Sequence, residues 1–123
     1  MKRLYKLSAY LLILYGIIHV AFTPVFFGRF GLEVMWFAGT GLGFVFLGNL
    51  NLVAILTKRL SLYTMIISSN LLGLLIMIVI VSMLHSIQAY IGLGITLLAL
   101  TGSVQQYISQ IKVVAETNFT ARH

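Results

Sequence analysis

The segment LSLYTMIISSNLLGLLIMIVIVSMLHSIQAYIGLGITLLALTGSVQQYISQI, residues 60–111, decides the fold because it contains no aspartate, glutamate, lysine or arginine. A helix that crosses the hydrocarbon core of a bilayer needs about 20 largely apolar residues. The segment is too long for one crossing and suits two, with a break near residues 84–88. We therefore predict two transmembrane helices here, at about residues 62–84 and 88–111.

Charged residues divide the first half of the chain in the same way. One uncharged run follows Lys6, and a second begins after Glu33 and continues until Lys58. These runs predict spans at about residues 7–27 and 33–56. Since the connections are short, neighbouring helices must run antiparallel. The predicted fold is all-α, with four transmembrane helices in an up-down-up-down antiparallel bundle.

The composition excludes a soluble protein and several kinds of chemistry. Hydrophobic residues make up 60% of the 123 residues and charged residues only 8%, whereas a soluble domain carries about 25% charged residues. The absence of cysteine excludes disulfides and thiolate sites. Glu33 and Glu116 are the only acids, so the chain has no obvious pair of carboxylates for hydrolysis. We predict no catalytic residues and favour a non-enzymatic protein.

The basic residues predict the topology, because lysine and arginine favour the cytoplasmic side of a membrane. Seven of the eight lie before the first span, between the second and third, or after the fourth: Lys2, Arg3, Lys6, Lys58, Arg59, Lys112 and Arg122. We predict a multi-pass protein of the plasma (inner) membrane with both termini cytoplasmic. Residues 1–112 form its transmembrane domain, and residues 113–123 form a short polar tail. The same placement explains the net charge of +6 without nucleic acid, so the expected partner is the lipid bilayer.

Polar residues gather near the predicted cytoplasmic ends of the helices. They are Asn49, Asn51, Asn70, Ser103 and Gln106. Unsatisfied polar groups are costly in hydrocarbon, and asparagine and glutamine form hydrogen bonds between membrane helices. These five residues are therefore predicted to form a polar layer that packs the helices together. At 100° per residue Asn49 lies nearly opposite Asn51, so only one of these two faces inward.

Two glycines in the second span are spaced for close helix packing. Gly39 and Gly43 form a G-x-x-x-G pattern, which lets the backbones of two membrane helices approach each other. A dinucleotide-binding loop is excluded because the third glycine of that motif is missing and no strand precedes it. We predict close packing at this pair, and a homo-oligomer that could use it.

The candidate ligand site lies toward the predicted outer side of the bundle. Its predicted residues are Tyr15, His19, Glu33, Trp36 and Thr40. The leading hypothesis is a binding module or accessory subunit that holds an apolar or lipid-like ligand within the bundle. Pro24 leaves two alternatives for the first span, because proline removes a backbone hydrogen bond. Either the helix continues through Pro24 with a kink, or it ends near Phe22, and His19 lies deeper in the first case.

Two other functions would use some of the same residues. An oligomeric small transporter or channel could use His19 and Glu33 as a site coupled to protons or ions, because ionisable groups inside a membrane are functional candidates. Alternatively, His19, Glu33 and His85 could bind haem or a divalent metal, since histidine ligates both. A third possibility, related to haem or metal binding, is an enzyme that uses His19, Glu33 and His85.

Overall fold

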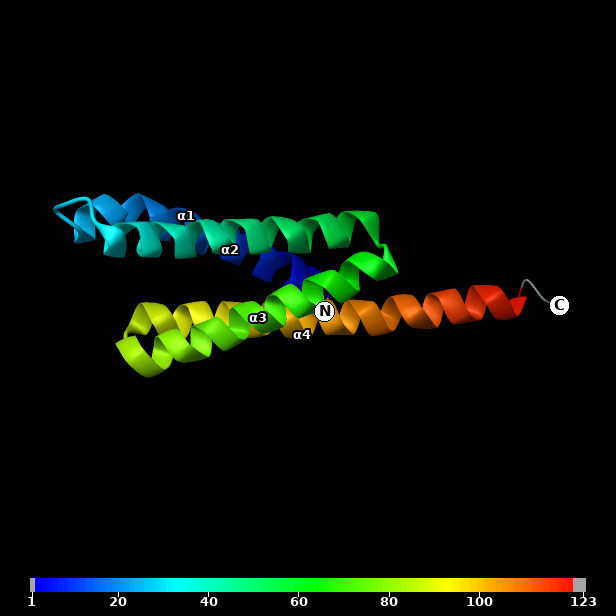
Figure 1. Cartoon of the computed structure of the whole chain (residues 1–123). Helices are drawn as coiled ribbons and strands as arrows, with labels where there is room; N and C mark the ends of the chain where they lie inside the picture. The colour runs from blue at the N-terminus through cyan, green and yellow to red at the C-terminus, as the bar shows by residue number, and fades with distance from the viewer. Residues whose placement is uncertain (1, 121–123) are drawn as a thin grey trace.

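The computed structural model describes residues 2–120 and contains four α-helices in this range (Figure 1). They are α1 (Lys2–Phe26), α2 (Leu32–Thr57), α3 (Leu60–Leu84) and α4 (Ile87–Thr120). The described residues form no strand. This confirms the predicted all-α fold and the break between the third and fourth helices, since α3 ends at Leu84 and α4 begins at Ile87.

All four helices are long and apolar enough to cross a membrane. Large apolar side chains cover much of the outer surface, among them Trp36, Phe46 and Leu56, which are 72%, 65% and 76% exposed. Extended apolar surface of this kind would be unfavourable in water. The surface therefore suits contact with lipid.

Two short turns end α2 and α3 in the same way. Lys58 and His85 both adopt the left-handed conformation, with φ of 52° and 46°. Their backbone N–H groups donate to the carbonyl oxygens of Ala54 and Val81, at 2.9 and 3.1 Å. A left-handed residue that satisfies a terminal carbonyl is a common way to end a helix. Each turn lets the next helix start within three residues and run antiparallel.

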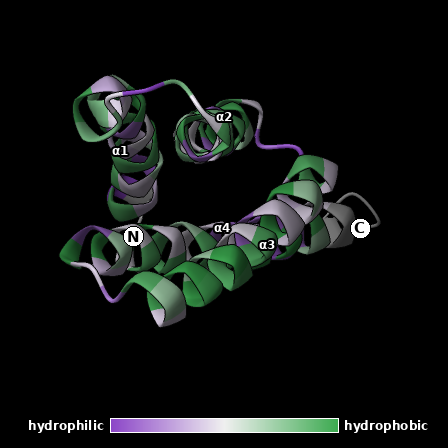
Figure 2. Ribbon diagram, turned by 60° about the vertical axis from the view of Figure 1, so that its left-hand side comes forward, coloured by the Kyte–Doolittle hydropathy of each residue, from purple (hydrophilic) through white to green (hydrophobic). Residues whose placement is uncertain are grey.

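The helices form two hairpins. The first consists of α1 and α2, the second of α3 and α4, and α1 also packs against α4, whereas α2 and α3 have few contacts. Figures 1 and 2 show α3 and α4 side by side, with α2 separated from them except near the turn between α2 and α3. We call the end that carries this turn, residues 58–59, the closed end. The end that carries the connections at 27–31 and 85–86 is the open end.

A hydrogen-bond network joins all four helices toward the closed end. The Tyr5 hydroxyl (α1) donates to Asn51 Oδ1 (α2) at 2.8 Å, and Asn51 and Asn70 (α3) donate to each other's amide oxygens at 2.9 Å. Asn70 Nδ2 also lies 3.1 Å from Ser103 Oγ (α4) and 3.3 Å from the Ala99 carbonyl. Of the other residues predicted for the polar layer, Asn49 is exposed and Gln106 is buried.

Apolar clusters lie on both sides of this network. Tyr5, Ala54, Tyr63 and Ile66 form one buried cluster nearest the turn between α2 and α3. A second cluster contains one residue from each helix: Leu12, Phe44, Met77 and Ala99. Beyond Phe44 and Met77, toward the open end, the described residues form no further cluster of buried apolar side chains. The packed core therefore ends about halfway along the bundle.

The close contact between α1 and α2 uses glycines other than the predicted pair. A Cβ atom added at Gly41 would lie 2.9 Å from the Gly16 carbonyl oxygen, and one added at Gly48 would lie 2.7 Å from the Ala9 carbonyl oxygen. Neither contact leaves room for a side chain. At Gly39 and Gly43, in contrast, a Cβ would meet nothing within 4 Å. The prediction of close packing at Gly39 and Gly43 is therefore wrong within the chain, because these glycines face away from α1.

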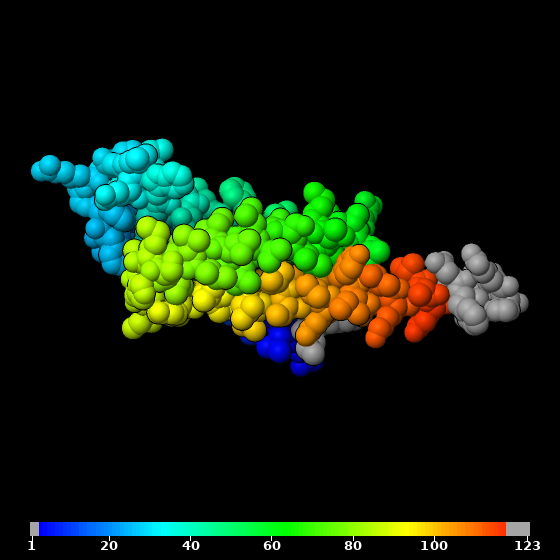
Figure 3. Space-filling view, turned by 60° about the horizontal axis from the view of Figure 1, so that its bottom comes forward, coloured from blue at the N-terminus to red at the C-terminus, as the bar shows by residue number. Residues whose placement is uncertain are grey.

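The C-terminal end of α4 is longer than the sequence predicts. The predicted tail begins at residue 113, but α4 continues to Thr120, and the rest of the predicted tail lies outside the described residues. In Figure 3 the part of α4 that is coloured red extends past the body of the molecule. The polar residues that follow Lys112 therefore extend the last helix.

Candidate ligand cavity

The first helix continues through its proline. The Thr23 hydroxyl donates to the His19 carbonyl oxygen at 3.0 Å, and the Phe27 N–H donates to the Thr23 carbonyl oxygen at 3.2 Å. These bonds surround Pro24, whose missing N–H leaves the Val20 carbonyl without its usual helical partner. Of the two alternatives, the structure has the helix that reaches Phe26. His19 therefore lies about 10 Å from that helix end, at 1.5 Å per residue.

His19 is held between α1 and α2 by aromatic contacts. Its imidazole stacks on the ring of Phe37, with centroids 3.8 Å apart and planes 19° from parallel, and lies 5.6 Å from the ring of Tyr15. The side chain is partly exposed. Neither ring nitrogen forms a hydrogen bond to any residue in the described part of the chain. The imidazole can therefore hydrogen-bond a ligand that enters beside it.

Tyr15 links the two hairpins next to His19. Its hydroxyl donates to the Gln88 carbonyl oxygen at the start of α4, at 2.9 Å, and its ring packs edge-on against Phe44, with centroids 5.0 Å apart. Gly92 makes room for the tyrosine, since a Cβ there would lie 3.0 Å from the hydroxyl oxygen. Tyr15 is thus fixed at the boundary between the packed core and the open end.

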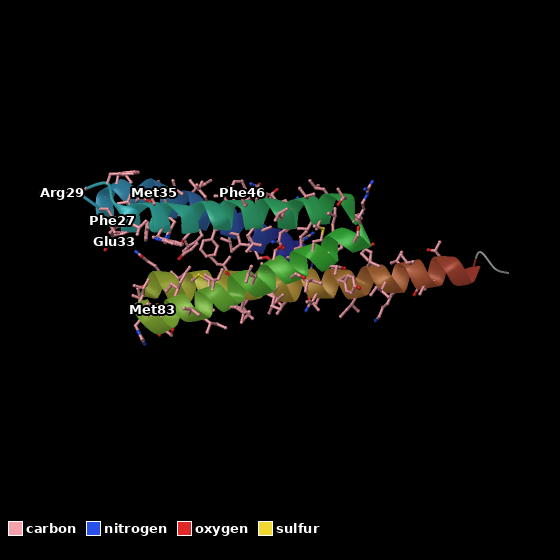
Figure 4. All side chains as sticks on the ribbon, in the orientation of Figure 1. Phe27, Arg29, Glu33, Met35, Phe46 and Met83 are labelled. Carbon is pink, nitrogen blue, oxygen red and sulfur yellow. The ribbon has the colours of Figure 1, made fainter. Side chains whose placement is uncertain are left out.

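All five predicted ligand residues line one cavity at the open end. Its volume is about 630 Å³. The lining comprises Tyr15, His19, Glu33, Trp36 and Thr40 together with Phe27, Phe37, Phe44, Met77, Ile80, Met83, Leu84, Ser86, Gln88 and Ala89. In Figure 4, Phe27 and Glu33 lie at the open end of the first hairpin, across from Met83 on α3. We call this space the mouth cavity.

A second space of about 560 Å³ adjoins the mouth cavity between α2 and α3. It is lined by Gly39, Gly43 and Leu47 of α2 and by Ser69, Leu72, Gly73 and Ile76 of α3, and shares Trp36, Thr40, Phe44 and Met77 with the mouth cavity. We call it the lateral groove. The two hydroxyl groups that line the groove already form hydrogen bonds, because Thr40 donates to the Trp36 carbonyl and Ser69 to the Met65 carbonyl. The wall of the groove is therefore suited to an apolar chain.

Glu33 and His85 are both exposed, and His85 stands apart from the cavity. Glu33 lies in the first turn of α2 and forms no salt bridge or hydrogen bond with another described residue. His85 is the residue directly after α3 and does not line the mouth cavity. Among residues 2–120, no three His, Cys, Asp or Glu side chains gather closely enough to hold a metal ion. The structure thus brings His19 and Glu33 to one cavity but does not assemble the three-residue metal site with His85.

Several residues of the mouth cavity and of the polar network were not predicted from the sequence. Phe27, Met77 and Ile80 line the mouth cavity, and nothing in their spacing distinguishes them from ordinary packing residues. The position of Tyr5 in the polar network could have been predicted from its spacing in the sequence. It lies three residues before Ser8 and seven before Leu12, which places it on the helix face that also carries Tyr15 and His19.

These features describe a small all-helical protein with four helices long and apolar enough to span a bilayer and a cavity at one end of the bundle. No protein-family model, curated protein or solved structure matches the chain.

Proposed function

We propose that this chain is a non-enzymatic membrane protein that binds an apolar or lipid-like ligand between its two hairpins. The observation that supports this most is the mouth cavity of about 630 Å³ and the lateral groove that adjoins it. Ligand pockets in proteins typically have volumes of about 300–1,000 Å³ and mostly apolar linings with few polar groups. Both properties are found here.

The two spaces suit different parts of an amphiphilic molecule. The groove offers glycine, leucine and isoleucine side chains, with the hydroxyls of Thr40 and Ser69 already bonded to their own helices. The mouth cavity contains polar side chains that are not bonded within the described chain: the His19 imidazole, the Glu33 carboxylate, the Trp36 indole and the Gln88 amide. An apolar body therefore lies in the groove, and its polar end lies beside His19 and Glu33.

Filling the groove tests this proposal. Gly43→Leu adds a side chain whose Cβ would have nothing within 4 Å, and Gly43 lines the groove, so the leucine should occupy part of the groove. Gly94→Leu is the matched control, because Gly94 is also open and lies on α4 outside both spaces. Native mass spectrometry of the purified protein should detect a bound apolar molecule in the wild type and the control, and much less in Gly43→Leu. Bare wild-type protein, or equal occupancy in both variants, contradicts the proposal.

We also propose the orientation of the chain in the plasma (inner) membrane, with both termini cytoplasmic. Its support is the grouping of basic residues at or beyond the closed end: Arg3, Lys6, Lys58, Arg59 and Lys112. Arg29 alone lies at the open end. Fusion of a reporter that is active only in the cytoplasm to the C-terminus should give active reporter. Activity of a reporter that works only outside the cytoplasm, fused at the same place, would contradict this orientation.

A second candidate function is transport coupled to protons or ions by an oligomer. The observation that favours it is that His19 and Glu33 line the same cavity. A second copy could pack against the open face at Gly39 and Gly43, where no Cβ would meet a neighbour. Liposomes containing the protein should then show proton- or ion-dependent flux above that of empty vesicles, and equal flux would contradict the candidate.

A further inference from the structure

The lining of the mouth cavity carries one charge, and it is negative. Glu33 is its only acidic residue, and no lysine or arginine belongs to the lining. The nearest basic residue in sequence, Arg29, lines a different depression with Pro24 and Phe30, which shares only Phe27 with the mouth cavity. No salt bridge within residues 2–120 neutralises the Glu33 carboxylate. The cavity therefore favours a positively charged group over a negatively charged one.

Aromatic rings surround the same space. Tyr15, Phe27, Trp36, Phe37 and Phe44 all contribute to its lining. Phe27 and Phe37 meet edge to face, with centroids 5.4 Å apart, while Trp36 is 72% exposed and stacks on no ring of the described residues. The face of an aromatic ring attracts a cation, and tryptophan is the most effective of the three types. Trp36 thus has a free face and shares the cavity with the only carboxylate of the lining.

We propose that the ligand of this cavity is a lipophilic organic cation that carries no phosphate, such as an aromatic or quaternary ammonium compound. The proposal rests on the proposed binding function and names the chemistry of its ligand. The carboxylate and the aromatic faces recognise the cationic centre, and the lateral groove receives the apolar body. A phospholipid headgroup fits less well because its phosphate would find no cationic side chain in the lining.

A pair of ions with equal shape and opposite charge tests this directly. Tetraphenylphosphonium and tetraphenylborate are both rigid and apolar, so they differ mainly in the sign of the charge. Equilibrium dialysis of each labelled ion against the full chain in a neutral detergent, at about pH 8 where an ordinary histidine is uncharged, should show saturable binding of the cation only. Since Trp36 is the only tryptophan, a parallel change in protein fluorescence reports on the cavity.

Two variants with the same change of net charge distinguish an effect of the cavity carboxylate on cation binding from an effect of the total charge of the protein. Glu33→Gln removes the carboxylate at the mouth, and Glu116→Gln removes the other acid of the chain, far along α4. Because an exposed ion pair contributes up to about 1 kcal/mol, Glu33→Gln should weaken binding of the cation by about fivefold. Glu116→Gln should leave the affinity unchanged.

The outcomes also distinguish this inference from the proposed function. Saturable binding of both ions with equal affinity, no saturable binding of the cation, or equal affinity in Glu33→Gln and Glu116→Gln would overturn the cation proposal. A wild-type protein that still carries an apolar molecule, lost in Gly43→Leu, would then show that the cavity binds an uncharged or zwitterionic ligand. Loss of the proposed function itself would appear as bare wild-type protein in the native spectra.

Discussion

The closed and open ends of the bundle are built from the same apolar helices, but different contacts hold the helices together at each end. At the closed end every helix contributes one side chain to a single network: Tyr5, Asn51, Asn70 and Ser103. At the open end the two hairpins are linked by the bond from Tyr15 to the Gln88 carbonyl, and α2 and α3 leave space between them. In lipid, where apolar surface gives little driving force for helix association, satisfied polar groups and close glycine contacts decide where helices stay together.

The largest expected effect comes from breaking the contact that pairs α1 with α2. Gly48→Leu would force its Cβ against the Ala9 backbone and the Ile13 side chain. Because overpacking against backbone typically costs 1–3 kcal/mol and sometimes more, we expect the free energy of unfolding to fall by about 3 kcal/mol.

Reversible unfolding in mixed micelles, followed by circular dichroism, measures this change. Gly43→Leu is the matched control, because the same side chain there meets open space and should alter stability little. Similar losses in both variants would mean that the difference between the two glycine faces has no energetic consequence.

The polar network at the closed end should give the next largest effect. Asn70→Leu removes the bonds to Asn51, Ser103 and the Ala99 carbonyl and leaves buried groups without partners. The expected loss in the free energy of unfolding is about 2 kcal/mol. Asn49→Leu serves as control, because Asn49 is exposed and leucine is well accommodated in lipid. Equal stability of the two variants in the same unfolding assay would refute the role of the network.

A smaller effect is expected at the open end. Tyr15→Phe keeps the ring that packs on Phe44 but removes the hydroxyl that donates to the Gln88 carbonyl. Loss of one hydrogen bond of this kind should cost about 1 kcal/mol. Hydrogen exchange of the backbone amides at the start of α4 should become faster in Tyr15→Phe and stay the same in Tyr10→Phe, whose ring is exposed. Unchanged exchange in Tyr15→Phe would show that this bond does not hold the hairpins together.

Much of the architecture could be predicted because charge is scarce in this sequence. Lys6, Glu33 and Lys58 interrupt uncharged runs long enough to cross a membrane, so the four helices follow from length alone. The five predicted ligand residues line one cavity, but the depth of His19 could not be predicted, because Pro24 left two alternatives for the first span. Their partners from α3 could not be chosen, since long apolar helices offer many equivalent faces.

The separation of the two hairpins could not be predicted from the spacing of residues in the sequence. It depends on which glycines meet a backbone, and Gly39, Gly41 and Gly43 are alike in sequence although only Gly41 contacts α1. Alternate glycines point to different faces of a helix, and the choice between those faces is made by the residues of the other helix. The continuation of α4 past Lys112 was missed for a different reason, because a polar composition resembles a tail whether or not it is helical.

Distances between spin labels at the two ends test the central claim most directly, that the closed end is fixed while the open end accommodates a ligand. The chain has no cysteine, so label pairs can be placed at the exposed Met35 and Ile87 for the open end, and at the exposed Leu56 and Met65 for the closed end. Addition of tetraphenylphosphonium to delipidated protein should shift and narrow the distance distribution of the Met35 and Ile87 pair, and leave the Leu56 and Met65 pair unchanged. Distributions that stay the same at both ends, or shift equally at both, would contradict it.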